Sequence, residues 1–301
     1  MSGGARSRSL AAWLGWLAGA ITAGYLGYVS VAGSRRLVRP GRRPLEADAG
    51  LPATPADLGL AYEDVRFTTD DGVTLSGWLI PAGRATRSAV VVMHGFTGHR
   101  LAELAAFVPW LQPAYHVLQF DFRGHGASGE ATITLGARER RDVAAAVRFL
   151  QGRGLSPIAL LGLSMGASVA IVAAPDLPVA AVVADAAFAD IRNPIANRMR
   201  GERYPLAGLG ARIIVAAASI RARVRLVSPI DRVAAIAPRG LLLIAPREDA
   251  LIDYTESLRL YAAAREPKEL YVVDDAEHAT ARWVGGREYE RRVLSFLEQH
   301  L

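Results

Sequence analysis

The chain has 301 residues, 51% of them apolar, so it can bury a core large enough for one α/β domain of about 250 residues. It has no cysteine, which excludes a disulfide framework, a thiolate nucleophile and a cysteine-based zinc site. The formal net charge is +6, but residues 1–43 carry seven arginines and no acidic residue, leaving 28 basic and 29 acidic side chains elsewhere. This near-neutral remainder lacks the basic surface of a nucleic-acid-binding protein.

The N-terminal segment contains an uncharged stretch, residues 10–32. As a helix it extends about 35 Å, enough to cross a bilayer. Trp13 and Trp16 lie toward one end and Tyr25 and Tyr28 toward the other, as expected for aromatic side chains at two membrane interfaces. The pattern predicts a single-pass N-terminal transmembrane helix.

A cleaved signal peptide is the alternative for this segment. Arg6 and Arg8 would be its basic region and residues 30–32, Ser-Val-Ala, its cleavage site, but the apolar run exceeds the usual length of roughly 7–15 residues. We therefore favour an anchor, with residues 1–36 as basic flank and transmembrane helix. Five arginines within residues 35–43 follow the span and two precede it, which favours a cytoplasmic C-terminal domain.

Residues 37–60 contain four prolines among small and charged residues, a composition typical of a linker. The main domain is expected over residues 61–301. It opens with two β-rich runs, residues 62–68 and 73–80, joined by Asp-Asp-Gly, which predicts an antiparallel hairpin.

Six short apolar runs follow, as expected for strands buried on both faces of a sheet. They occupy residues 88–93, 115–120, 157–161, 179–184, 240–245 and 269–273. Helical patterns lie between them, including residues 137–151, 164–174, 254–265 and 287–300. The alternation predicts an α/β fold with a mostly parallel eight-stranded sheet and helices on both faces.

Residues 191–230 interrupt the alternation, because they are about twice as long as one crossover needs and carry eight arginines against one acid, Glu202. An insertion here would lie over the carboxyl ends of the strands, where open α/β sheets bind ligands. We expect a small helical cap. Its charge indicates either attraction to anionic groups or a solvated arginine face.

A candidate nucleophile lies at residues 162–166, Gly-Leu-Ser-Met-Gly, between a strand pattern and a helix pattern. In this G-x-S-x-G elbow a sharp turn projects the serine oxygen above the sheet. The motif alone is weak, because a chain with 29 glycines yields one by chance in roughly one sequence of five. Ser164 is therefore a candidate whose partners must be found.

The general base must be a histidine that follows the serine, since hydrolases with this elbow place serine, acid and histidine in that order. Only His278 and His300 do so. His300 is the penultimate residue of a terminal helix pattern, whereas His278 comes just after a strand pattern. His278 is thus the candidate base.

The acid is expected in a loop just past a strand end, where a carboxylate can orient the imidazole. Asp249 meets this condition after the strand at residues 240–245. Its competitors are Asp185, which is also at a strand end, and Glu248. The ordinary role of Asp185 would be to cap a helix or turn by hydrogen bonding, and that of Glu248 would be a surface charge. We favour Asp249.

Two backbone N–H groups should bind the oxyanion. One is that of Met165, the residue after the nucleophile, and the other should come from the loop after the third strand. That loop is His-Gly-Phe-Thr-Gly at residues 94–98, and the N–H of Phe96 is the best placed. We expect His94 to order this loop by hydrogen bonding.

Together these motifs resemble the serine α/β-hydrolase family, and within it the membrane-anchored, esterase- or peptidase-like members with a small cap. The similarity covers about residues 61–301 and is carried by HGFTG, DFRGHGASG, GLSMG, APREDALID and AEH. It implies no metal and no organic cofactor. One departure is Ala245-Pro246, where the family often has a glycine before the acid. The resemblance implies catalytic Ser164, Asp249 and His278, with Phe96 and Met165 as oxyanion donors.

A G-x-G-x-x-G match at residues 124–129 follows a strand pattern but does not predict dinucleotide binding. The helix starts only near residue 137 and no acidic strand end follows at the required distance. We expect a membrane-anchored serine hydrolase acting on a small-molecule or lipid-like ester, thioester or amide. An acyltransferase with the same residues and a catalytically silent interaction module are the alternatives.

Overall fold

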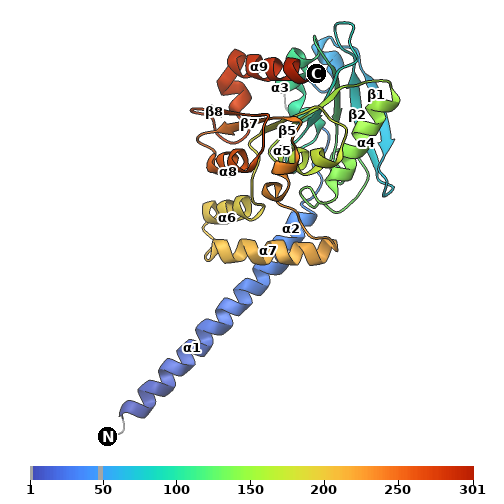
Figure 1. The fold of residues 1–301 in the computed structure, drawn as a ribbon. Helices are drawn as coiled ribbons and strands as arrows, with labels where there is room; N and C mark the ends of the chain where they lie inside the picture. Colours follow the sequence, from blue (N-terminus) through green and yellow to red (C-terminus); the bar gives the residue numbers. More distant parts are fainter. Residues whose placement is uncertain (1–2, 47–49) are drawn as a thin grey trace.

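The computed structural model describes residues 3–46 and 50–301 and consists of a domain from which one long helix projects (Figure 1). Helix α1 (Gly3–Tyr28) continues through a π-helical turn (Val29–Gly33) into α2 (Ser34–Val38). Within the described residues one helix, Ala12–Val38, is long and apolar enough to cross a membrane, with a mean hydropathy of 1.3. The helix therefore extends past residue 32, where the predicted span ends.

The predicted eight-stranded sheet is confirmed. Its strands are β1 (Glu63–Thr68), β2 (Thr74–Ile80), β3 (Ala89–Met93), β4 (His116–Phe120), β5 (Ile158–Leu163), β6 (Ala181–Asp185), β7 (Gly240–Pro246) and β8 (Lys268–Val273). The order across the sheet is β1-β2-β4-β3-β5-β6-β7-β8. Strand β2 is antiparallel to both β1 and β4, and all other pairs are parallel. This is the α/β-hydrolase fold.

Two apolar clusters, one on each face of the sheet, hold the domain together. In β3, Val91 packs into the cluster shared with α4 and α5, while Val90 and Val92 pack into the cluster shared with α3 and α9. This alternation explains why the central strands are apolar along their whole length. The helices are α3 (Leu104–Leu111), α4 (Glu139–Gly152), α5 (Met165–Ala173), α8 (Thr255–Ala263) and α9 (Ala281–His300). Short 3₁₀ turns cover Pro55–Leu58, Arg100–Glu103, Ala174–Asp176, Pro229–Asp231 and Val233–Ala235.

Helix α9 begins before its predicted start at residue 287, and Gly286 with φ 51° and ψ −129° interrupts it. Glycine readily adopts this conformation, so two helical segments join there. Helix α3 was not among the predicted elements.

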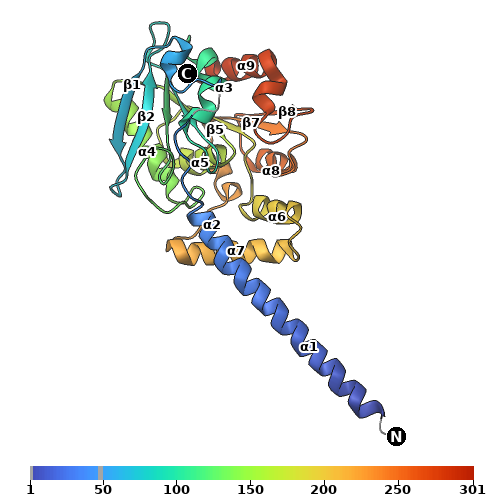
Figure 2. The same ribbon diagram turned by 180° about the vertical axis from the view of Figure 1, so that it is seen from behind.

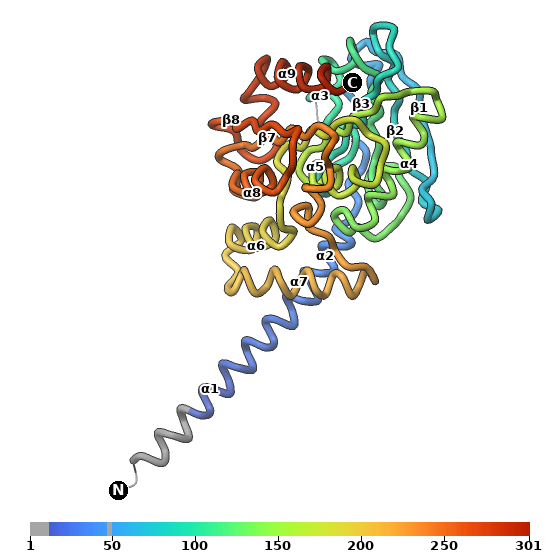
Figure 3. Tube along the Cα trace, in the orientation of Figure 1, coloured from blue at the N-terminus to red at the C-terminus, as the bar shows by residue number. Residues whose placement is uncertain are grey.

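Two further helices, α6 (Arg192–Gly201) and α7 (Ala207–Ala222), lie between β6 and β7. We call residues 191–230 the cap. Helix α7 runs across the N-terminal helix at the end of the domain from which that helix projects (Figures 2 and 3). A small apolar cluster of Val29, Met199, Ala207 and Ile214 joins the two. The cap and the N-terminal helix therefore pack as one unit.

Candidate active site

Ser164 lies between the last residue of β5 and the first residue of α5. Its backbone has φ 55° and ψ −111°, a conformation that costs a non-glycine residue on the order of 1–3 kcal/mol and that occurs at functional sites. The surrounding core holds this strain, because both flanking elements are buried. Ser164 is 9% exposed, so its hydroxyl is sheltered but reachable.

The two glycines of the elbow are required by close packing. A Cβ at Gly162 would overlap the backbone of Gly166 and Ala167, and one at Gly166 would overlap the carbonyl oxygen of Met93 at the end of β3. Helix α5 therefore starts directly against the neighbouring strand. Its N-terminus, with the partial positive charge of aligned peptides, lies beside the serine.

His278, in the loop between β8 and α9, joins the serine to a carboxylate. Its Nε2 lies 3.0 Å from Ser164 Oγ, and its Nδ1 lies 2.6 Å from Asp249 Oδ2. In the tautomer that fits these contacts, Nδ1–H donates to Asp249 and Nε2 accepts from the serine hydroxyl. The three side chains lie 114 and 29 residues apart in sequence and meet because β5, β7 and β8 end at one edge of the sheet.

Asp249 is rigidly held and nearly excluded from solvent, at 4% exposed. Its Oδ1 accepts the backbone N–H groups of Leu251 and Ile252, at 2.9 and 2.8 Å, which leaves Oδ2 for the imidazole. The competitor Glu248 is exposed. The other competitor, Asp185, bonds Tyr289 instead of the histidine.

The loop after β3 is ordered by His94, as expected. His94 Nε2 accepts the N–H of Phe122 at 3.1 Å, so its Nδ1–H donates to the Gly95 carbonyl at 2.8 Å. Burial lowers the pKa of His94 well below its usual value, which keeps the ring neutral in this pattern. The Gly95 carbonyl also accepts the N–H of Gly98 at 3.1 Å.

These contacts determine the direction of the Phe96 N–H. The Gly95 carbonyl and the Phe96 N–H belong to one planar trans peptide and point in opposite directions. A Cβ at Gly95 would lie 3.6 Å from Ser164 Cβ, so this peptide is next to the serine. Among the described residues, neither the Phe96 nor the Met165 N–H has a hydrogen-bond partner. Both donors are free for a ligand.

A buried acidic cluster lies under this loop and was not predicted. Tyr289 Oη donates to Asp185 Oδ2 at 2.8 Å, and the Asp185 carbonyl accepts the Ser164 N–H at 2.8 Å. Burial raises the pKa of Asp185 to about 7, and burial together with the Asp185 charge raises that of Glu103 to about 8. The sequence carries no signal for this cluster, because its members are far apart in the chain.

The glycine-rich segment at residues 124–129 wraps a carboxylate. Asp121 accepts the N–H of Arg100 at 2.7 Å and that of Ala127 at 2.9 Å, and a Cβ at Gly126 would overlap its carboxyl group. No helix begins at these glycines, since α4 starts at Glu139. Within residues 3–46 and 50–301, no three histidine, aspartate or glutamate side chains gather as a metal site.

Three comparisons place these features among known proteins. The family model for serine aminopeptidases of type S33 matches residues 84–224. The polyketide transferase GrgF of Penicillium is 30% identical over 290 residues, which cover 80% of this chain and 98% of that protein.

Among solved structures, the Pyrococcus furiosus esterase Pf2001 superposes with a TM-score of 0.73 at 31% identity, covering 88% of this chain and 98% of the esterase. The structure of GrgF, described as an α/β hydrolase, superposes with a TM-score of 0.64 at 28% identity and covers 80% and 99% of the two chains.

Proposed function

Because the chain belongs to the serine α/β-hydrolase family, we propose that it is a membrane-anchored serine hydrolase that cleaves an ester, thioester or amide through an acyl-enzyme intermediate. One observation carries the proposal, the hydrogen-bonded series from Ser164 through His278 to Asp249. Such a series is what an unactivated hydroxyl needs to become a nucleophile near neutral pH.

In the proposed first step, Ser164 Oγ attacks the carbonyl carbon of the substrate while its proton passes to His278 Nε2. Asp249 stabilises the imidazolium that forms, since its Oδ2 already accepts Nδ1–H. The carbonyl π electrons move onto oxygen, and the resulting oxyanion takes the N–H groups of Phe96 and Met165 as donors.

The tetrahedral intermediate then collapses, the bond to the leaving group breaks, and His278 returns its proton to the departing oxygen, sulfur or nitrogen. This leaves an acyl group on Ser164. A water molecule gives a proton to His278 and its oxygen attacks the acyl carbon. The bond from this carbon to Ser164 Oγ then breaks, the acid is released, and His278 returns the proton to Oγ, which restores the serine hydroxyl. Apart from the substrate and this water, each step uses only groups that the chain supplies.

The test is ester hydrolysis by the full chain in detergent micelles, comparing Ser164→Ala with Ser295→Ala. Ser295 is an exposed serine on α9 and provides the matched control. Ser164→Ala should lower kcat by ~10⁴-fold or more, and Ser295→Ala should keep wild-type activity. Equal activity of the two variants would refute the proposed nucleophile, and a folded but inactive wild type would favour a catalytically silent module.

Acyl transfer to an acceptor other than water is a second candidate, because one relative is named a polyketide transferase. It uses the same acyl-enzyme but releases the acyl group to an alcohol or amine. Product analysis with a primary alcohol added to the ester assay separates the two. A transferase forms the new ester in excess of the free acid even at low alcohol concentration, whereas a hydrolase forms mainly the acid.

We also propose the domain division expected from the sequence, with an N-terminal flank and anchor in residues 1–36, a linker in residues 37–60 and the hydrolase domain in residues 61–301. It is supported by the apolar helix that projects from the domain (Figure 1). Intact mass of the purified protein tests the anchor, because a cleaved signal would remove residues up to Ala32. Protease digestion of intact cells tests the cytoplasmic orientation, which requires that the domain be protected.

A further inference from the structure

A pocket of about 290 Å³ lies between the N-terminal helix, the cap and the loop after β3. This volume is near the roughly 300 Å³ lower limit of ordinary ligand pockets, so it suits one alkyl chain better than a whole lipid. Most of its wall is apolar. Its apolar lining includes Val29, Ala32, Leu37, Phe96, Met199 and Ile214.

Phe96 connects this pocket to the nucleophile. Phe96 lines the pocket, and a Cβ at the preceding residue, Gly95, would lie 3.6 Å from Ser164 Cβ, so this part of the pocket wall is close to the serine. An acyl group bonded to Ser164, with its carbonyl oxygen at the Phe96 N–H, would therefore begin beside the apolar wall. The pocket is placed to receive the rest of the acyl chain.

The N-terminal helix is firmly docked where it forms this wall. Val29 is 4% exposed, and a Cβ at Gly33 would lie 2.6 Å from the side chain of Ile214 on α7. Tyr25 Oη donates to the Pro205 carbonyl at 2.6 Å. The helix that is apolar enough to cross a bilayer thus supplies one side of the pocket.

The outer face of α7 is apolar. Leu209, Ile213, Ala216 and Ile220 follow one another at helical spacing, and we call them the α7 stripe. Leu209 is 46% and Ile220 79% exposed. Contiguous exposed apolar residues of this kind mark sites that contact a protein partner or a membrane.

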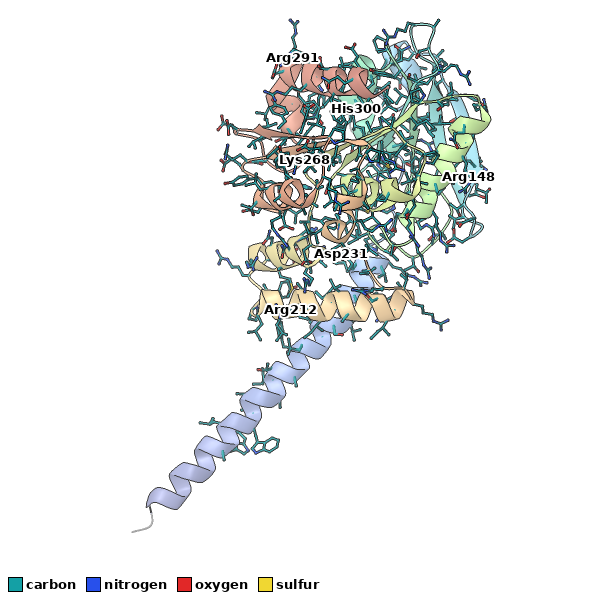
Figure 4. All side chains as sticks on the ribbon, viewed as in Figure 1. Arg148, Arg212, Asp231, Lys268, Arg291 and His300 are labelled. Atoms are coloured by element: carbon teal, nitrogen blue, oxygen red, sulfur yellow. The ribbon has the colours of Figure 1, made fainter. Side chains whose placement is uncertain are left out.

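The position of the stripe indicates which partner covers it. Helix α7 lies at the end of the domain from which α1 projects, where Figure 4 labels Arg212. Arg212 and Arg223 flank the stripe and are exposed. Helices that rest on anionic bilayers carry exposed cations beside their apolar face in the same way. A bilayer crossed by α1 would meet this end of the domain.

We propose that the pocket holds the acyl chain of an ester-linked membrane lipid, which enters from the bilayer beside α1 while the α7 stripe rests on the membrane surface. This inference rests on the proposed hydrolase function and adds the substrate class and its source. Exposed Arg36 and Arg198 line the same pocket. Arg198 forms a salt bridge with Glu202, which also lines the pocket, so Arg36 is the cation placed to attract an anionic head group. The half-buried Ala32 is the most direct residue to test, because an indole there would fill the pocket.

The experiment uses the full chain in phosphatidylcholine vesicles containing phosphatidylglycerol. The substrates are the butyrate and palmitate esters of umbelliferone, which share one leaving group. The quantity compared is the ratio of kcat/KM for palmitate to that for butyrate. Ala32→Trp should lower this ratio about tenfold, which corresponds to excluding roughly two methylenes from the pocket. Ala262→Trp, the same change at an exposed alanine on α8, should leave the ratio and the activity at wild-type values.

An unchanged ratio in Ala32→Trp, or an equal loss on both esters, would overturn the pocket assignment. If this variant does not fold, Ile195→Trp on α6, at another pocket residue, carries the same prediction. A wild type that hydrolyses neither ester would instead overturn the proposed function, so the two failures are distinguishable.

The source of the substrate is tested with Ile220→Glu against Val284→Glu, an exposed valine on α9. Ile220→Glu should slow hydrolysis of vesicle-embedded palmitate ester several-fold relative to the same ester in detergent micelles. Val284→Glu should slow neither. If the rate of Ile220→Glu relative to wild type is the same in vesicles as in micelles, the chain takes long-chain esters from solution. That result would overturn the proposal that the substrate enters from the bilayer.

Discussion

Two regions of the molecule are held together differently. One is the set of strand ends that carry Ser164, Asp249 and His278, and the other is the junction between the N-terminal helix and the cap. The strand ends belong to one sheet with a large core on both faces, and the serine and aspartate are largely buried. The junction is held by a cluster of four buried residues and leaves a pocket and an apolar stripe open. Under the proposed function, chemistry and substrate selection reside in separate parts of the molecule.

This separation has a consequence for mutagenesis. A change at the strand ends should reduce the hydrolysis of every substrate in the same proportion, because it alters the bond-making step. A change at the junction should alter preference among substrates. A variant at the strand ends that changes the preference for acyl-chain length would contradict this separation of roles.

The largest effect is expected for His278→Ala. Without the imidazole, Ser164 has no base and the leaving group has no acid, so kcat should fall by ~10⁴–10⁶-fold. The loss should be equal for butyrate and palmitate esters, as steady-state kinetics in micelles will measure. His300→Ala is the matched control, because its ring packs on Phe296 far along α9. Comparable losses in the two variants would refute the assignment of the base.

Asp249→Asn should lower kcat by ~10⁴-fold, since an amide at this position no longer favours the tautomer with a proton on Nδ1. Asp185→Asn is the control at the other strand-end carboxyl. It should lower kcat far less, because Asp185 bonds Tyr289 and not His278. The opposite order of effects would transfer the orienting role to Asp185.

His94→Ala is expected to have an intermediate effect. It removes the donor that holds the Gly95 carbonyl and so loosens the position of the Phe96 N–H. We expect kcat to fall by about 10–100-fold. This is less than the roughly 10²–10³-fold fall expected when one oxyanion donor is lost completely. KM should change little, which separates this role from a general loss of the fold. His116→Ala is not a suitable control, because the half-buried ring of His116 contacts the Thr86 carbonyl in the loop before β3. Circular dichroism of His94→Ala serves as the control for folding instead.

The smallest effect is expected at Glu103, in the acidic cluster under the loop after β3. Burial raises the pKa of Glu103 to about 8, so this carboxyl binds a proton more tightly in the folded chain than in the unfolded chain. Its contribution to stability is therefore complete below the unfolded pKa of about 4.3 and is lost as pH rises through about 8. The melting temperature of the wild type should fall between about pH 5 and pH 9.

Glu103→Gln should reduce that fall by a few degrees, because one to two kcal/mol changes the melting temperature of a domain this size by about 2–8 °C. Differential scanning fluorimetry of the full chain in detergent at both pH values measures it. An identical pH dependence in Glu103→Gln and wild type would show that Glu103 is ionised in the folded chain.

The sheet was predictable because two β-rich runs flank a hairpin turn signal and the other strands lie in short apolar runs, and all eight lie within a few residues of their expected positions. The positions of Ser164, Asp249 and His278 followed from short motifs and chain order, and the structure brings their side chains together. Their catalytic roles remain proposals. The same holds for the donors Phe96 and Met165.

The remaining features depend on contacts between distant residues. Helix α3 has eight residues with an internal Pro109 and is apolar all round, so it has no amphipathic period to reveal it. Glu103 and Tyr289 meet Asp185 only in the folded chain. The packing of Val29 and Gly33 on α7 likewise has no local signature, so the sequence could indicate a membrane helix and a cap without indicating that they enclose a pocket.

Mapping a fluorophosphonate adduct by peptide mass spectrometry on the full chain tests the central claim most directly. Such probes bond only to a serine that is activated as a nucleophile. The account predicts a single adduct on Ser164 that is lost in His278→Ala. An adduct on another residue, or no adduct on the folded wild type, would contradict it.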